Sequence, residues 1–231
     1  MKQLSSVPPD ATAALYFLPG QYLFADFREE ACAIKALSSE QVSCAFRGVH
    51  TDTGWLDRKV LRYREASEGN AIISYEPAAI KNIYVSLPGG HVESLAVPLP
   101  TLILLGKGTD YYLWGASSCH ATAKTKLAVA PLPNIGLGKI CFGKNEVPEV
   151  HPSNLNSVWK LIFETPFNGD HAGNRCRTEP DDVRNLLIKL AADKARRFPT
   201  PQLITSSSTV EDAWETIVEQ RRYDSRFYNA I

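Results

Sequence analysis

Hydrophobic positions in the first 130 residues come in short runs that are separated by turn residues. The runs are rich in β-branched and aromatic residues and are bounded by Gly, Pro, Asp and Asn, which indicates strands rather than helices. The predicted strands cover residues 13–18, 22–27, 71–75, 82–87, 92–97, 101–105 and 111–114. The stretch 37–56 has no clear pattern and receives no assignment.

Two turn-rich segments separate neighbouring strands closely enough for hairpins. Pro88-Gly89-Gly90 lies between one pair, and residues 106–110, which contain two glycines, lie between another. Short glycine-containing connections of this kind are typical of antiparallel hairpins. The pattern therefore predicts an antiparallel β-meander.

Beyond residue 150 the apolar residues follow the helical repeat instead. Ser153 is the predicted N-cap of a first helix, which ends before Pro166, and Pro180 opens a second helix. Ser208 and Glu211 form a predicted capping box in front of a third helix. Strands followed by helices predict an α+β fold.

The segment around residues 199–208 has the composition of a linker. Pro199 and Pro201 favour extended backbone, and the serines at 206–208 have little to bury. The predicted organisation is one domain over residues 1–198, including an N-terminal strand extension, and a linker with a C-terminal helix over residues 199–231.

Composition describes an ordinary globular chain. Of its 231 residues, 44% are hydrophobic and 22% are charged, with 25 basic and 25 acidic side chains and a net charge of zero. A neutral chain has no overall field that would attract nucleic acid or an anionic membrane. The only dense basic stretch is residues 189–197, so we expect no nucleic-acid partner.

The cysteines and the N-terminus indicate a cytoplasmic protein. The five cysteines, at 32, 44, 119, 141 and 176, are an odd set without paired short spacings, which favours a reducing compartment. The first residues contain no apolar core of a signal peptide. The longest apolar run, at 102–105, is far shorter than the roughly 20 residues of a membrane-spanning helix. We expect no membrane association.

The segment around Cys141 contains the most specific chemistry. Its thiol follows a glycine-broken loop that begins with Pro133-Asn134. Glycines let a backbone approach a ligand closely, and an Asn carboxamide can donate a hydrogen bond to a developing oxyanion. Lys139 and Lys144 bracket the thiol and would lower its pKa, unless both are simply solvated. The alternative is a buried structural cysteine after an ordinary turn.

The same segment resembles the active site of ubiquitin-conjugating enzymes. That family has a His-Pro-Asn tripeptide, an Ile or Val, a loop ending in Gly, and an Ile/Val-Cys pair whose Cys holds ubiquitin as a thioester. The residues that follow this order are Pro133, Asn134, Ile135, Gly138, Ile140 and Cys141. Leu132 stands in place of the His, and the loop is slightly shorter than in that family.

A wider resemblance covers residues 71–171 and is to protein B of the bacterial PRTRC gene clusters, a prokaryotic branch of that superfamily which lacks this His. The matching pieces are residues 73–78, 99–105, 111–116, 130–134, the Cys141 motif, Trp159 and residues 162–167. In this branch a His closes the last piece. His171 is the nearest equivalent, displaced by three residues, Asn168-Gly169-Asp170.

The resemblance implies a ubiquitin-conjugating-enzyme-like fold and a transferase activity. Cys141 would carry a ubiquitin-like modifier as a thioester and pass it to an acceptor amine, Asn134 would stabilise the oxyanion, and His171 would replace the missing His. The implied partners are the modifier and a ThiF-type activating protein, with a JAB-type peptidase as a further candidate. No cofactor is implied.

Two other functions stay open. The same fold can bind a modifier or scaffold a partner without transferring anything, although a Cys retained beside Asn134 favours transfer. An unrelated cysteine hydrolase would pair Cys141 with His151 or His171, but the chain has no Cys-Gly-containing protease signature.

A metal site is a weaker candidate. Four residues could ligate zinc: Cys119, His120, His171 and Cys176. They lack the closely spaced pairs from which one turn supplies two ligands, so we expect no metal. Phosphate-binding and dinucleotide-binding fingerprints are also missing from the sequence.

Overall fold

The computed structural model describes residues 8, 10–28, 33–46, 55–66, 69–87 and 89–220. Contacts between residues divide the chain into two compact units, Met1–Trp55 and Leu56–Ile231. The sequence predicted a division near residue 198 instead. The structure differs because the segment after residue 198 supplies a strand and a helix to the second unit.

The first unit contains a three-stranded antiparallel sheet, in the order β1-β2-β3, and a helix that contacts β2 and β3. Its elements are β1 (Ala13–Leu18), β2 (Gln21–Asp26), β3 (Ala33–Leu37) and α1 (Ser39–Phe46). The first two strands were predicted. The helix lies in the stretch that received no assignment from the sequence. Ser38 and Gln41 form a capping box at its start. The N–H of Gln41 donates to Ser38 Oγ at 3.1 Å, and the N–H of Ser38 donates to Gln41 Oε1 at 2.9 Å.

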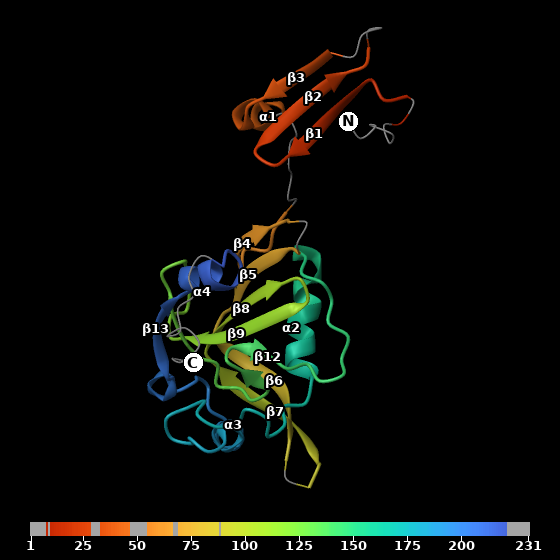
Figure 1. The fold of residues 1–231 in the computed structure, drawn as a ribbon. Coiled ribbons are helices and arrows are strands. Elements are labelled where there is room, and N and C mark those ends of the chain that lie inside the picture. Colours follow the sequence, from red (N-terminus) through yellow and green to blue (C-terminus); the bar gives the residue numbers. More distant parts are fainter. Residues whose placement is uncertain are drawn as a thin grey trace. The chain divides into compact units, whose positions relative to one another are not determined.

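Within the described residues, the second unit is built on an eight-stranded antiparallel sheet (Figure 1). Its main path runs β11-β12-β9-β8-β5-β4, and β10 pairs with both β9 and β13. The strands are β4 (Val60–Arg64), β5 (Ala71–Glu76), β8 (Thr101–Lys107), β9 (Asp110–Ala116), β10 (Lys126–Val129), β11 (Ile135–Gly136), β12 (Lys139–Ile140) and β13 (Thr205–Thr209).

The sheet is not the simple meander that the sequence predicted, because β6 (Ala79–Ser86) and β7 (Val92–Leu99) leave it. They pair with each other as a two-stranded ribbon, and β5 pairs directly with β8. The predicted hairpins are confirmed, since β6 pairs with β7 and β8 with β9, all antiparallel. The ribbon buries Ile83 and Val85 and contacts α2 (Leu155–Glu164) through β6 and α3 (Val183–Ala192) through β7.

Helix starts differ from the predictions by one to three residues. Ser153 lies inside a 3₁₀ turn, Pro152–Asn154, which is capped by His151, whose Nδ1 accepts from the N–H of Ser153 at 3.2 Å. α2 begins only after this turn. The second helix, α3, is capped by Asp182, which accepts from the N–H of Arg184.

The last helix, α4 (Val210–Ile217), also begins one residue later than predicted. Its capping box joins Thr209 and Asp212 rather than Ser208 and Glu211. The reason is tertiary: β13 pairs with β10 up to Thr209, so the preceding residues are extended. No described helix has the length and apolar character needed to cross a membrane.

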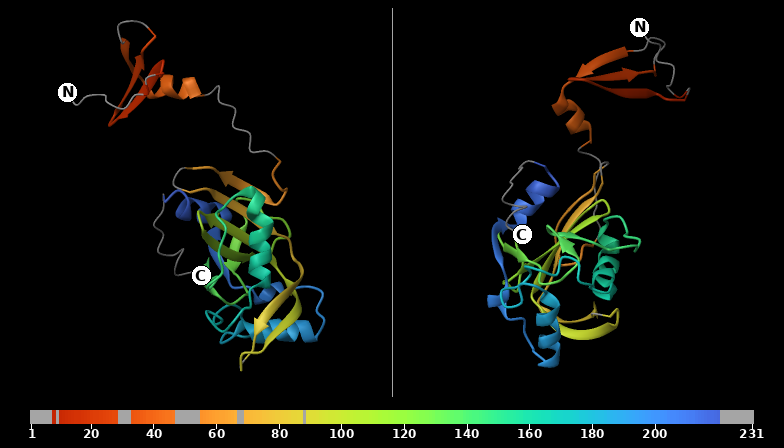
Figure 2. Two further views of the ribbon diagram at one scale, coloured as in Figure 1. Left: turned by 90° about the vertical axis from the view of Figure 1, so that its right-hand side faces the viewer. Right: turned by 60° about the horizontal axis from the view of Figure 1, so that its bottom comes forward.

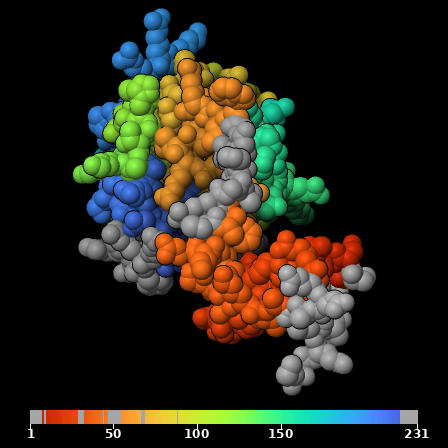
Figure 3. All heavy atoms as spheres, turned by 90° about the horizontal axis from the view of Figure 1, so that it is seen from above, coloured from red at the N-terminus to blue at the C-terminus, as the bar shows by residue number. Residues whose placement is uncertain are grey.

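Two apolar cores lie on the two faces of the sheet. Alternate residues of β8 point to opposite sides: Leu102 and Leu104 join the core that includes α2 and α3, whereas Ile103 and Leu105 join the core that includes α4. Figure 2 shows α2 and α4 on opposite sides of the strands, and Figure 3 shows residues of β4 and β5 between these helices. Trp159 of α2 is buried in the core on the α2 side of the sheet.

Candidate functional site

A short hairpin presents the candidate nucleophile. β11 and β12 pair antiparallel, and only Leu137 and Gly138 connect them. Both have positive φ, 49° and 81°, which is the signature of a type I′ turn. A side chain at Gly138 would place its Cβ 3.1 Å from Nε1 of Trp114. The glycine therefore approaches the sheet core, not a ligand as the sequence alone suggested.

Cys141 follows β12 directly and is exposed. Its backbone N–H donates to the carbonyl oxygen of Asn134 at 2.8 Å, which fixes the two residues beside each other across the hairpin. The exposed thiol excludes the alternative of a buried structural cysteine.

Asn134 is held in one orientation. Its φ is 61°, a conformation that Asn tolerates better than most residues. Its side-chain Oδ1 accepts from the backbone N–H of Asn168 at 3.1 Å, and its own N–H donates to the carbonyl oxygen of Asp170 at 2.7 Å. Because a backbone N–H can only donate, the carboxamide atom that faces Asn168 must be the oxygen, and the atom on the other side is Nδ2. Among the described residues, this amide has no acceptor, so its protons remain available.

Asn134 and Cys141 line the same surface hollow, whose volume is about 210 Å³. Its walls come from the loop after β12, the end of α2 and the segment after it. The other lining residues are Phe142, Gly143, Lys144, Asn145, Thr165, Pro166, Asn168 and Asp170. The hollow thus combines a thiol, an amide donor, one cation and one carboxylate at the surface.

The two lysines that bracket Cys141 in sequence have different environments. Lys139 Nζ lies 2.8 Å from Asp110 Oδ1, and this hydrogen bond raises the pKa of the lysine. Lys139 is therefore paired with a carboxylate on β9. Lys144 is the only cation among the described residues that line the hollow.

His171 lies beside this site rather than in it. A Cβ on Gly136 would be 3.0 Å from His171 Nε2, so the imidazole packs against the β11–β12 hairpin. His171 does not line the hollow that contains Cys141. His151, the competing histidine, caps the turn before α2.

The comparison with protein families decides what the chain is related to. Prokaryotic E2 family D matches residues 33–206, which include Asn134, Cys141 and His171. The chain belongs to this family. The predicted resemblance to a prokaryotic branch of the ubiquitin-conjugating (E2) enzymes is thereby confirmed. No curated protein and no solved structure matches the chain.

Sequence reasoning missed one residue that shapes the site of this family D protein, Arg175. It is 6% exposed, and burial lowers the pKa of its guanidinium. Its Nε donates to the carbonyl oxygen of His171 at 2.8 Å, and its Nη2 donates to the carbonyl oxygen of Ile135. It therefore ties the loop after α2 to the β11–β12 hairpin. An Arg between Asn174 and Cys176, in a loop segment without a periodic pattern, gives no sequence signal for this role.

The candidate zinc ligands of the family D protein are not assembled. Cys176 is buried, and its thiol donates to the carbonyl oxygen of Glu179 at 3.4 Å, whereas Cys119 is exposed. In the described part of the chain, no group of three or more His, Cys, Asp or Glu side chains could hold a metal ion.

Proposed function

We propose that this E2-like protein carries a ubiquitin-like modifier as a thioester on Cys141 and transfers it to an acceptor amine. The observation that supports the proposal is the shared hollow, where an exposed thiol lies beside an amide donor whose orientation is fixed. A fixed donor costs no reorganisation when charge develops on a carbonyl oxygen.

The chemistry proceeds in two exchanges at the modifier's carbonyl carbon. In loading, the Cys141 thiolate attacks the thioester on the activating protein; a new C–S bond forms and the old thiolate leaves. In discharge, an acceptor amine attacks, the C–S bond breaks, and the amine loses a proton to water. Each tetrahedral intermediate carries an oxyanion. Asn134 Nδ2 is the proposed donor to that oxyanion during discharge.

His171 is the third residue of the proposed site. Its imidazole lies against Gly136 and outside the hollow, which favours a positioning role for the hairpin over direct proton transfer. The carbonyl oxygen of the same residue accepts from Arg175. His171 and Arg175 together would hold the segment that contacts Asn134.

The proposal requires protein partners. Loading needs a ubiquitin-like modifier with an activated C-terminus and a ThiF-type activating protein that supplies it. A JAB-type peptidase is the candidate for removing the modifier again. These partners follow from the proposed chemistry and the family.

Loading is tested with the full-length protein, its cognate activating protein, the modifier and ATP. Wild type should form a modifier adduct that reducing thiols remove, and Cys141→Ala should form none. Cys119→Ala is the matched control, because Cys119 is also an exposed thiol but lies outside the Cys141 hollow. This variant should load as wild type does. Cys141→Ser should give an adduct that resists reducing thiols, because an oxyester replaces the thioester.

Other outcomes identify the alternatives. Modifier binding without an adduct on wild type would indicate a non-catalytic binding module of the same fold. Release of free modifier from a preloaded substrate, without an intermediate on Cys141, would overturn the transfer proposal and indicate a hydrolase. A hydrolase that pairs Cys141 with His151 is disfavoured, because His151 Nδ1 is already hydrogen-bonded to Ser153.

A further inference from the structure

A second hollow of the same unit is larger than the one beside Cys141. Its volume is about 420 Å³, within the range of small-molecule pockets. It lies where the ends of β7 and β9 meet the segment after α3, and it shares no lining residue with the hollow of Cys141. Its ligand is therefore separate from the thioester chemistry.

The floor of this pocket is apolar. Leu99, Ala116 and Phe198 line it and are each at most 6% exposed. A ligand that fills the pocket must therefore present carbon atoms to this floor, because polar groups placed there would lose their hydration without gaining partners.

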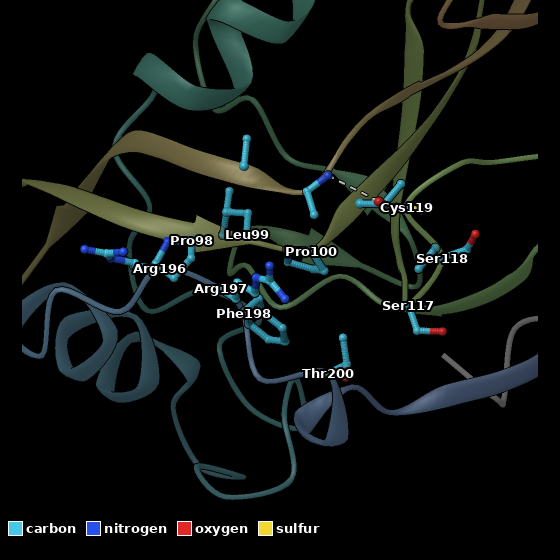
Figure 4. A pocket seen from close by; sticks show the side chains of 14 residues that line it. Pro98, Leu99, Pro100, Ser117, Ser118, Cys119, Arg196, Arg197, Phe198 and Thr200 are labelled. Carbon is cyan, nitrogen blue, oxygen red and sulfur yellow. Dashed lines mark hydrogen bonds between the residues drawn. The ribbon is translucent and has the colours of Figure 1, made fainter.

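The rim of the pocket is cationic. Arg196 and Arg197 line it, and none of the described residues that line it is an Asp or Glu. Within the described part of the chain, neither guanidinium has an ion pair or a hydrogen bond. Figure 4 shows Arg197 in the middle of the pocket beside Phe198, with Arg196 on one side and Ser117 on the other.

Further donors border the pocket on the side of Ser117. The turn after β9 contributes Ser117, Ser118 and Cys119. The amides of Ser118 and Cys119 donate to no backbone carbonyl among the described residues. The Ser118 hydroxyl is already used, since it donates to the carbonyl oxygen of His120 at 2.5 Å. Guanidinium groups and free backbone amides are the groups with which proteins bind phosphate.

We propose that this pocket binds a small organic phosphate, with the phosphoryl group on Arg197 and the carbon skeleton over Leu99 and Phe198. Inorganic phosphate alone would leave the apolar floor uncovered. A neutral ligand would leave two cations unpaired. Only a ligand with both parts matches the floor and the rim together. The proposal is independent of the transfer activity of Cys141.

Calorimetric titration of the full-length protein tests the match of both parts. The probes are AMP, its phosphate-free counterpart adenosine, and inorganic phosphate. AMP should bind roughly tenfold more tightly than either of the others, since adenosine lacks the charge-assisted contact and inorganic phosphate lacks the apolar contact. Absence of AMP binding, or equal binding of inorganic phosphate or adenosine, would overturn the proposal.

Variants locate the binding. Arg197→Ala should weaken binding by roughly tenfold or more and Arg196→Ala by less, because Arg197 lies in the middle of the pocket. Lys189→Ala is the matched control: it removes one exposed cation of α3 that does not line the pocket. An equal loss in Lys189→Ala would show diffuse charge attraction instead of a site and would end the proposal.

Cysteine protection gives an independent readout. Cys119 lines the pocket and is exposed, whereas Cys141 is exposed and lines the other hollow. Bound organic phosphate should slow alkylation of Cys119 several-fold, as mapped by mass spectrometry, and leave Cys141 unchanged in the same sample. Equal effects on both thiols, or none on Cys119 at saturation, would contradict the placement.

Discussion

The surroundings of Cys141 and Cys119 differ although both thiols are exposed. Cys141 follows a hairpin with a two-residue turn, its N–H donates to the carbonyl oxygen of Asn134, and Asn134, whose side chain is held by Asn168, lines the same hollow. Cys119 lies in a turn after β9, beside a pocket whose rim holds two arginines. Exposure makes a thiol available, and the neighbouring donors determine which chemistry is favourable there.

The charges of the two regions also differ. The hollow of Cys141 contains one lysine and one aspartate, Lys144 and Asp170, so its cation is balanced. The pocket of Cys119 has two arginines and no carboxylate among the described residues that line it. A balanced site suits a large neutral acyl group whose charge appears only in the transition state. An unbalanced cationic pocket suits a ligand that is already an anion.

The largest expected difference is in alkylation rate, between the buried thiol of Cys176 and the exposed thiols of Cys141 and Cys119. Cys176 is 1% exposed, and burial raises the pKa of its thiol. Less of it is therefore present as thiolate near neutral pH than for a thiol with an ordinary pKa. With iodoacetamide at pH 8, Cys176 should react on the order of a thousandfold more slowly than Cys141 and Cys119, because it must wait for local unfolding. Site-resolved mass spectrometry measures the three rates. A Cys141 rate as low as that of Cys176 would break the comparison.

The next contrast compares Asn134 and Asn145, two of the three asparagines that line the Cys141 hollow. Asn134→Asp keeps the acceptor for the N–H of Asn168 but removes the amide donor, and should slow discharge of preloaded protein on the order of 100-fold. Asn145→Asp is the matched control, since Asn145 lines the same hollow and its Nδ2 donates to Thr165 Oγ1. Single-turnover discharge onto an amine measures both. Equal rates for the two variants would remove the oxyanion role.

A third contrast compares a buried and an exposed arginine. Arg175→Met removes the donors to the carbonyl oxygens of Ile135 and His171 and should lower the free energy of unfolding by about 2 kcal/mol. Arg197→Met, at the exposed pocket rim, should change it by less than about 0.5 kcal/mol. Urea denaturation measures both. Equal midpoints would show that Arg175 does not brace the Cys141 hairpin.

The smallest expected effect concerns His171. If its imidazole only positions the hairpin, His171→Ala should slow discharge by roughly tenfold, less than Asn134→Asp, because it displaces the site without removing a donor. The pH profile of discharge should keep its shape, since no proton passes through this residue. His120→Ala, in the turn beside Cys119, is the control and should leave discharge unchanged. Loss of an ionisation from the profile would instead assign His171 as a base.

Much of the secondary structure and the candidate nucleophile were readable from sequence because they depend on local chemistry. Alternating apolar residues and glycine-rich turns identified the paired strands β6–β7 and β8–β9. The Pro133-Asn134 step, the hairpin glycines and Cys141 lie within one short segment, so their order alone indicated the family that the comparison then confirmed.

What the sequence left open depends on contacts between distant segments. Local pattern could not show that β6 and β7 leave the sheet to meet α2 and α3, or that β13 pairs with β10 and so shifts the cap of α4 to Thr209. Nor could it show Arg175 between two loops, or Arg197 beside the turn after β9. The physical reason is that local preferences are set by neighbours in the chain, whereas burial, hydrogen-bond partners and pockets are set by residues that only the folded chain brings together.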